Sequence, residues 1–248
     1  MLPWPVLADG PSDPAVVGRL GPVLHPQAVM LALDGSLSPA TQWRVVLTDD
    51  DGCALAVATM RLAPEDTGAA RATPGTTAVV GRVTVTVRAS QTGLLDTASQ
   101  GYRRADGRVL TTRRQVILRA ASVAARTASR RYEEERAADA AGGGQCAHSA
   151  STGSYVPSPR LREYVMARDV TCRHVTCGQP AWRGDLDHTI PWDAGGRSCR
   201  CNLGPICRTH HKVKQLPGWQ LEQVRPGWFR WTTPAGLSYD VGPDPYPV

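Results

Sequence analysis

The chain has 248 residues, enough for one large or two small domains with a buried core, and we expect two. Its formal net charge of +6 comes almost entirely from arginine, which suits phosphate contacts but is also what codon bias in a GC-rich genome produces. The sequence has neither an apolar run long enough to span a bilayer nor a basic leader with an apolar core, which predicts a cytoplasmic protein and no membrane partner.

Residues 1–141 are expected to form a partial N-terminal domain of mixed α/β structure. The first 24 residues are rich in proline and glycine and are predicted to be irregular. Alternation of apolar and polar residues then predicts three strands, the first two joined as a hairpin, at residues 43–48, 53–58 and 79–87. The interval 64–78 is predicted to be a loop.

Apolar and alanine residues at helical spacing predict a basic helix over residues 111–141. This helix either lies along DNA or joins two domains as a surface helix, and its mixed charges favour the second interpretation. Residues 142–155 are rich in glycine and serine and are predicted to be a linker. His148, inside this linker, has no partner at ligand spacing and is predicted to be inert.

Residues 156–248 are expected to form a second domain. A helix is predicted to begin at Ser158, which can cap it, and to end near Asp169. Three arginines of this helix are candidate phosphate contacts: Arg160, Arg162 and Arg168. Alternation over residues 219–241 predicts a small β-meander, with tryptophans that are more commonly core residues than base-stacking ones: Trp219, Trp228 and Trp231. The tail at 242–248 is predicted to be extended.

Most of the seven cysteines lie beside histidines in residues 172–214, which fits metal thiolates in a reducing compartment. Two short knuckles supply four ligands of the kind that closes a structural zinc site: Cys172, Cys177, Cys207 and His210. The Cys-x-Cys pair formed by Cys199 and Cys201 could replace one of these ligands, although knuckle spacing favours a loop role for it. His174, within the first knuckle, is predicted to be exposed.

Four polar residues remain once the zinc ligands are assigned: Asp187, His188, Asn202 and His211. They are too few to close a structural site, and an open metal position suits hydrolysis. Adjacent helical residues point about 100° apart, so His210 and His211 can each face a different metal ion. A zinc module without catalysis is the alternative, but it would have no use for these four residues.

Three stretches carry a resemblance to a known family: residues 185–192 (Asp-Leu-Asp-His-Thr-Ile-Pro-Trp), 202–205 (Asn-Leu-Gly-Pro) and 207–211 (Cys-Arg-Thr-His-His). They resemble the HNH endonucleases and, with Arg168-Asp169, are similar to the actinobacterial HNH proteins of the 13E12-repeat family. The resemblance covers about residues 155–248. It implies an α+β chain with a C-terminal ββα-metal domain and a structural Zn²⁺.

The resemblance also implies roles for the second set of residues. Asp187 and His211 would hold a catalytic divalent ion such as Mg²⁺ or Mn²⁺, and His188 would be the general base. Asn202 would either brace the loop that aims His188 or approach the metal. The implied function is hydrolysis of phosphodiester bonds in DNA, by nicking unless two chains act as a homodimer. The alternative is a non-catalytic zinc-stabilised DNA-binding module, which would be indifferent to loss of His188.

Overall fold

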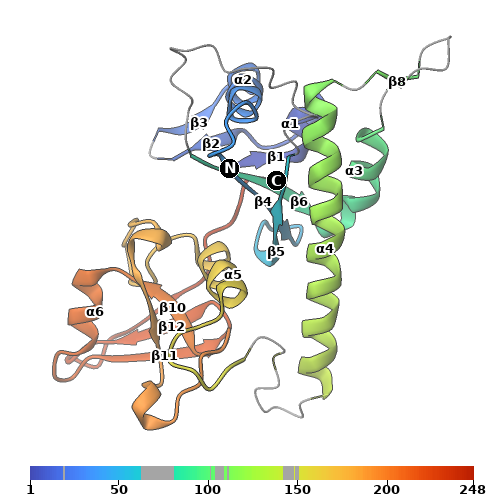
Figure 1. Cartoon of the computed structure of the whole chain (residues 1–248). Coiled ribbons are helices and arrows are strands. Elements are labelled where there is room, and N and C mark those ends of the chain that lie inside the picture. The colour runs from blue at the N-terminus through green and yellow to red at the C-terminus, as the bar shows by residue number, and fades with distance from the viewer. Residues whose placement is uncertain are drawn as a thin grey trace. The chain divides into compact units, whose positions relative to one another are not determined.

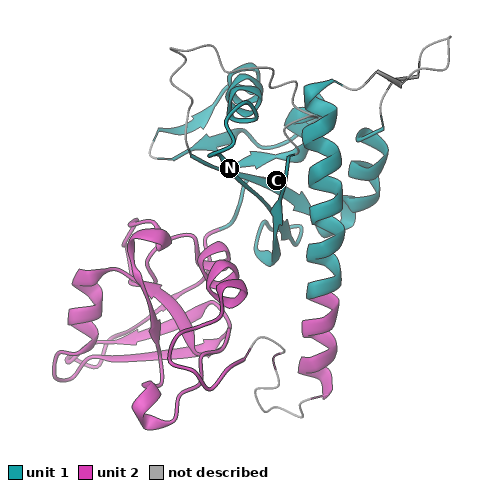
Figure 2. Ribbon diagram, viewed as in Figure 1, with its two compact units in different colours: residues 1–131, 245–248 teal, residues 132–244 magenta. Residues whose placement is uncertain are grey.

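The computed structural model describes residues 1–18, 20–62, 81–100, 102–103, 109–110, 112–141, 148 and 151–248. The loop expected at 64–78 and, apart from His148, the linker residues 142–150 lie outside the described residues. Within the described part the chain is a mixed α+β protein with six α-helices and several sheets, which confirms that class. Contacts divide it into two compact units, residues 1–131 with 245–248 and residues 132–244 (Figure 2).

A four-stranded mixed sheet lies at the centre of the first unit (Figure 1). Its order is β1-β6-β4-β5, with bounds Leu2–Pro3 for β1, Arg82–Arg88 for β6, Gln42–Thr48 for β4 and Ala54–Met60 for β5. The predicted hairpin is confirmed as the antiparallel β4–β5 pair, and its turn contains Gly52 at φ +83°. Strand β6 pairs in parallel with both β1 and β4, and four valines of β4 and β6 are fully buried: Val45, Val46, Val85 and Val87.

The first 24 residues are not irregular, which corrects the prediction. After β1 they form α1 (Trp4–Leu7), β2 (Ala15–Val17) and β3 (Gly21–Val23). Leu2 pairs with Val85 of β6, and both side chains are buried. Elements of two to four residues are too short to show a periodicity. Strand β1 is stabilised by pairing with the distant β6, whereas β2 and β3 pair with each other.

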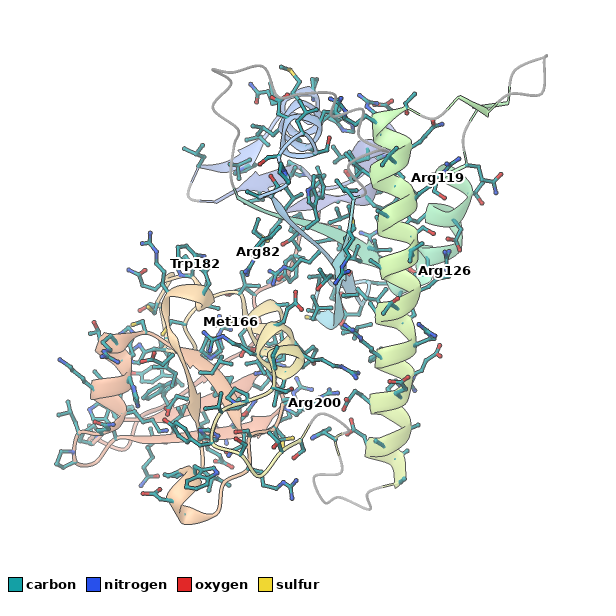
Figure 3. The ribbon with its side chains drawn as sticks, in the orientation of Figure 1. Arg82, Arg119, Arg126, Met166, Trp182 and Arg200 are labelled. Atoms are coloured by element: carbon teal, nitrogen blue, oxygen red, sulfur yellow. The ribbon has the colours of Figure 1, made fainter. Side chains whose placement is uncertain are left out.

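Helices α2 (His25–Gly35), α3 (Thr92–Ala98) and α4 (Arg113–Ala141) and the short pair β7 (Tyr102–Arg103) and β8 (Val109–Leu110) complete the N-terminal part. The prediction of a helix at 111–141 is confirmed by α4. Its arginines partly pack against α3: Arg119 Nε donates to the Ser99 carbonyl at 3.1 Å, and Arg126 binds Asp96 (Figure 3). The contact division falls at residue 131, inside α4, whereas the sequence placed the boundary in 142–155.

The second unit is built on α5 (Pro159–Asp169), a hairpin of β9 (Asp185–His188) and β10 (Leu203–Ile206), and α6 (Arg208–Lys214). Helix α5 starts as predicted, with Ser158 Oγ accepting from the Leu161 amide at 3.2 Å. Its apolar side packs Leu161 and Val165 against Leu203 of β10. The hairpin is therefore supported from one side by α5.

The predicted meander consists of β11 (Gln220–Arg225), β12 (Trp228–Thr232) and β13 (Ser238–Val241). Trp231 is fully buried and packs on Cys172 and Ile206, as expected of a core residue, whereas Trp228 is 37% exposed. Residues 242–248 contain no helix or strand. The last four belong to the first unit rather than to the predicted C-terminal domain: the Tyr246 amide donates to the Gly52 carbonyl at 2.9 Å.

Among the residues that the structure describes, none of the helices combines the length and the apolar character that a membrane span requires.

Candidate metal centre

The two predicted knuckles meet in the second unit. The ligand atoms of four residues all lie within 4.8 Å of one another: Cys172, Cys177, Cys207 and His210. His210 Nδ1 is 3.2 Å from Cys207 Sγ and 3.6 Å from Cys172 Sγ. Nitrogen and sulfur ligands on one tetrahedral zinc ion are about 3.6 Å apart, given the usual bond lengths. The cluster therefore has the donor set and spacing for a metal such as zinc.

Packing and hydrogen bonds position this cluster at the end of β10. The Arg173 amide donates to the Pro205 carbonyl at 2.8 Å, and Trp231 Nε1 donates to the Arg173 carbonyl at 2.6 Å. The His174 and His210 rings stack with centroids 3.7 Å apart, so His174 is partly buried and the prediction that it is exposed is wrong. The first knuckle is thus fixed against β10 and β12.

Electrostatics differ between the ligands. Burial raises the pKa of Cys172 to about 12, so the uncompensated thiolate is disfavoured there. Burial also opposes ionisation of Cys207, but hydrogen bonds from the backbone of His210 and from neighbouring cysteines lower its pKa overall. Burial lowers the pKa of His210, which favours the neutral imidazole needed in a ligand. A cation bound among the sulfurs would offset the cost of the buried thiolates.

Asp187 of β9 and His211 of α6 lie close to each other. In the β9–β10 ladder Asp187 pairs with Gly204, and its Oδ1 is 3.6 Å from His211 Nε2. Lys214, one turn after His211, donates to Asp187 Oδ2 at 2.6 Å and to the His188 carbonyl at 2.5 Å. His210 and His211 therefore face different groups, as the helical geometry predicts, and Lys214 is a contact that sequence reasoning missed.

His188 is 5% exposed and does not join the Asp187–His211 pair. Its Nε2 is 2.8 Å from Ser198 Oγ, which in turn is 2.7 Å from the Ser154 carbonyl oxygen. A carbonyl only accepts, so the Ser198 hydroxyl donates to it and accepts the proton of His188 Nε2. Nδ1 is then the unprotonated nitrogen of the neutral ring.

Burial lowers the pKa of His188, and the Lys214 charge adds to this effect while Asp187 opposes it. The Tyr155 ring stacks on the imidazole with centroids 5.5 Å apart. A neutral, buried imidazole with one fixed tautomer is suited to accept a proton. Nothing in the sequence spacing singled out Ser198 or Tyr155 as its partners.

Asn202 braces the loop between β9 and β10. Its Oδ1 accepts from the Ile190 amide at 2.7 Å, and its Nδ2 donates to the Ile190 carbonyl at 3.1 Å and to the Arg197 carbonyl at 3.0 Å. A Cβ on Gly196 would meet the Ile190 oxygen at 1.9 Å, so the loop closes too tightly for a side chain there. Of the two roles left open for Asn202, these contacts match the brace.

Two further expectations are wrong. Arg168, a candidate phosphate contact, is 2% exposed and forms a buried ion pair with Asp169 at 2.6 Å. His148, expected to be inert, has its Nδ1 2.8 Å from Cys199 Sγ, and Cys201 lies beside them. These three residues form a Cys/His group separate from the knuckles.

Comparison with known proteins finds uncharacterized relatives. The uncharacterized protein Rv3776 of Mycobacterium tuberculosis is 42% identical over 91 residues, which are 36% of this chain and 17% of the relative. The uncharacterized protein Rv2100 of the same organism is 40% identical over 95 residues, 38% of this chain and 17% of the relative. The match thus spans about a sixth of the length of these curated relatives. No protein-family model matches the chain, and no solved structure matches it significantly.

Proposed function

We propose that the second unit is a divalent-metal-dependent endonuclease of the HNH type that hydrolyses phosphodiester bonds in DNA. The observation that carries the proposal is the position of His188, a buried imidazole with an unprotonated Nδ1, next to Asp187 on β9, where Asp187 meets His211 of α6. The knuckle cluster, holding zinc, would fix α6 and with it His211. Zinc in this role is structural, because four protein ligands leave no open position.

The residues of the second site fit a catalytic cation. Two ligands on one ion, each about 2.1 Å from it, are about 3.0–3.4 Å apart, close to the 3.6 Å between Asp187 Oδ1 and His211 Nε2. When bound there, a divalent ion would supply charge stabilisation for the attacked phosphate and the departing oxygen. Lys214 holds the Asp187 carboxylate so that Oδ1 points to His211. The His211 side chain is 31% exposed, which leaves room for a phosphate.

His188 would act as the general base. Ser198 fixes its tautomer through Nε2, and Nδ1 takes the proton of the attacking water. Burial keeps the imidazole neutral at the pH of the cell, since it lowers the pKa of His188. Asn202 acts through the loop: it holds the residues that follow His188 and so maintains the direction of the ring.

A polyanionic substrate is consistent with the charges around α6. Arg208 and Lys212 are exposed on the helix that carries His211. Tyr155 and Trp192, both largely exposed, contact each other beside His188 and offer flat surfaces on which bases can stack. Together these features suit a nucleic acid that places its backbone at Asp187 and its bases against the aromatic rings.

One observation favours the alternative, a zinc-stabilised DNA-binding module without turnover. The Asp187 carboxylate is already paired with Lys214 at 2.6 Å, and a neutralised carboxylate needs no metal ion. In that module Asp187 would be a structural residue of the hairpin, and loss of His188 would change DNA affinity only slightly.

A supercoiled-plasmid assay separates the two functions. The purified chain is tested with Mg²⁺ or Mn²⁺ and with a chelator, beside His188→Ala and a matched control, His25→Ala, in the first unit. The nuclease predicts metal-dependent nicking that the control retains and His188→Ala loses. Absence of nicking by the parent chain, with zinc and DNA affinity retained, would favour the binding module.

A further inference from the structure

The strongest feature outside the proposed nuclease site is the group formed by His148, Cys199 and Cys201. We propose that it is a further metal site, separate from the knuckle cluster and from the Asp187–His211 pair, for zinc or a similarly soft divalent ion. The three ligand atoms lie within 4.8 Å of one another, with His148 Nδ1 2.8 Å from Cys199 Sγ and the two sulfurs 3.3 Å apart. Two thiolates neutralise a divalent cation, and two sulfurs with one imidazole select zinc over the hard, oxygen-seeking ions.

A carboxylate orients the histidine of this site. His148 Nε2 lies 2.7 Å from Asp139 Oδ1, near the C-terminal end of α4. An imidazole that ligates a metal through one nitrogen ordinarily donates the other N–H to a carboxylate, which fixes the tautomer and the ring direction. Donation from Nε2 to Asp139 leaves the Nδ1 lone pair directed at the cysteines.

The backbone between the two cysteines is held independently. Arg200, labelled in Figure 3, is the intervening residue, and its carbonyl accepts from Arg168 Nη1 at 2.5 Å and from Gln223 Nε2 at 3.2 Å. The Asn202 amide donates to the Cys199 carbonyl at 3.0 Å, which closes a turn around the pair. Cys199 is 1% exposed. The sulfurs are therefore positioned by the fold, and His148 completes the set from a residue 51 positions earlier.

Occupation of the site would connect separate parts of the second unit. The ion would join His148, and through it Asp139 of α4, to the turn that precedes β10. Three of the described residues supply a ligand atom each to this ion. The inference does not depend on nuclease activity, because it concerns a different set of ligands.

Metal stoichiometry tests the proposal directly. The full chain, purified under reducing conditions with zinc supplied, is measured by elemental mass spectrometry, beside Cys199→Ser/Cys201→Ser and a matched control, Cys53→Ser, in the first unit. We expect about two zinc ions per chain in the parent and the control and about one in the double variant. With Co²⁺ as a probe, the double variant should lose part of the thiolate-to-metal absorption and keep that of the knuckle cluster.

Two milder variants remain informative if the double variant fails to fold. His148→Ala should lower the affinity of this group for zinc, measured by competition with a chelator. Asp139→Asn should lower the same affinity by about 10–100-fold. The proposal is overturned if the parent binds about one zinc ion and the double variant binds the same amount. A disulfide between Cys199 and Cys201 in protein purified under reducing conditions would also overturn it. So would an unchanged affinity for zinc in His148→Ala.

Discussion

Replacement of Asn202 by alanine tests how the hairpin aims His188. The substitution removes three hydrogen bonds from a buried side chain, two to Ile190 and one to Arg197. At about 1 kcal/mol of net free energy for each bond, the closed loop should lose about 3 kcal/mol relative to its open states. Every 1.4 kcal/mol is a factor of ten, so local opening should become about 100-fold more frequent.

Hydrogen exchange measures this opening. The Gly196 amide is a suitable reporter, because it donates its hydrogen bond to the Pro191 carbonyl at 3.0 Å inside the loop and not to the Asn202 side chain that is removed. The matched control is Thr189→Val: the buried Thr189 hydroxyl has no hydrogen-bond partner among the described residues, so its loss should leave exchange nearly unchanged. Unchanged Gly196 exchange in Asn202→Ala, combined with loss of nicking and of the catalytic ion, would refute the brace and assign Asn202 to the metal.

Three further outcomes are expected. Because burial lowers the pKa of His188 from 6.5, the neutral base persists to lower pH, and the acid limb of the nicking rate should lie below pH 6.5; a limb above that value would contradict the assignment. Gly204→Ala should lower the melting temperature, since a Cβ there meets an aromatic ring of β12 at 2.4 Å, at a cost of about 1–3 kcal/mol, whereas Gly178→Ala should not. Arg168→Ala should lower the free energy of unfolding of the second unit, measured by chemical denaturation, by about 3–5 kcal/mol, because it leaves the buried Asp169 carboxylate unpaired. Arg162 is exposed, so Arg162→Ala should leave this free energy close to that of the parent.

The knuckles and the hairpin were predictable because short spacings determine them. Cys207 and His210 lie three positions apart at the start of a helix, so their side chains share one region whatever the rest of the chain does. Helical geometry likewise predicts that His210 and His211, adjacent on α6, point in different directions. Lys214 could have been added by this reasoning, since it lies one turn beyond His211 on the same helix.

Several contacts that the sequence did not reveal join distant segments. His148 meets Cys199 across 51 residues, and no spacing rule connects a histidine in a glycine-rich stretch with a Cys-x-Cys pair. Arg168 follows a typical amphipathic pattern at the end of α5, and its burial depends on the distant carbonyls of Arg200 and Leu203 as well as on Asp169. Tyr246 is a further example: it is buried in the first unit, among residues far from it in the sequence. Local patterns contain no information on such partners.

The two Cys/His groups lie at the two ends of β10, where bound metal ions would help to position the side chains of the small β9–β10 hairpin. Strands β9 and β10 pair over only four residues, and the two described apolar clusters of the second unit are each built on three buried residues. Side chains that bind the same metal ion, or between which a proton moves, must be placed within about 0.5 Å. Apolar packing by two clusters of this size does not provide such precision by itself. Cys207 follows β10 directly and Cys201 precedes it by two positions. With an ion bound in each group, β10 would be anchored at both ends, and β9 with Asp187 and His188 would be held in register by pairing with it.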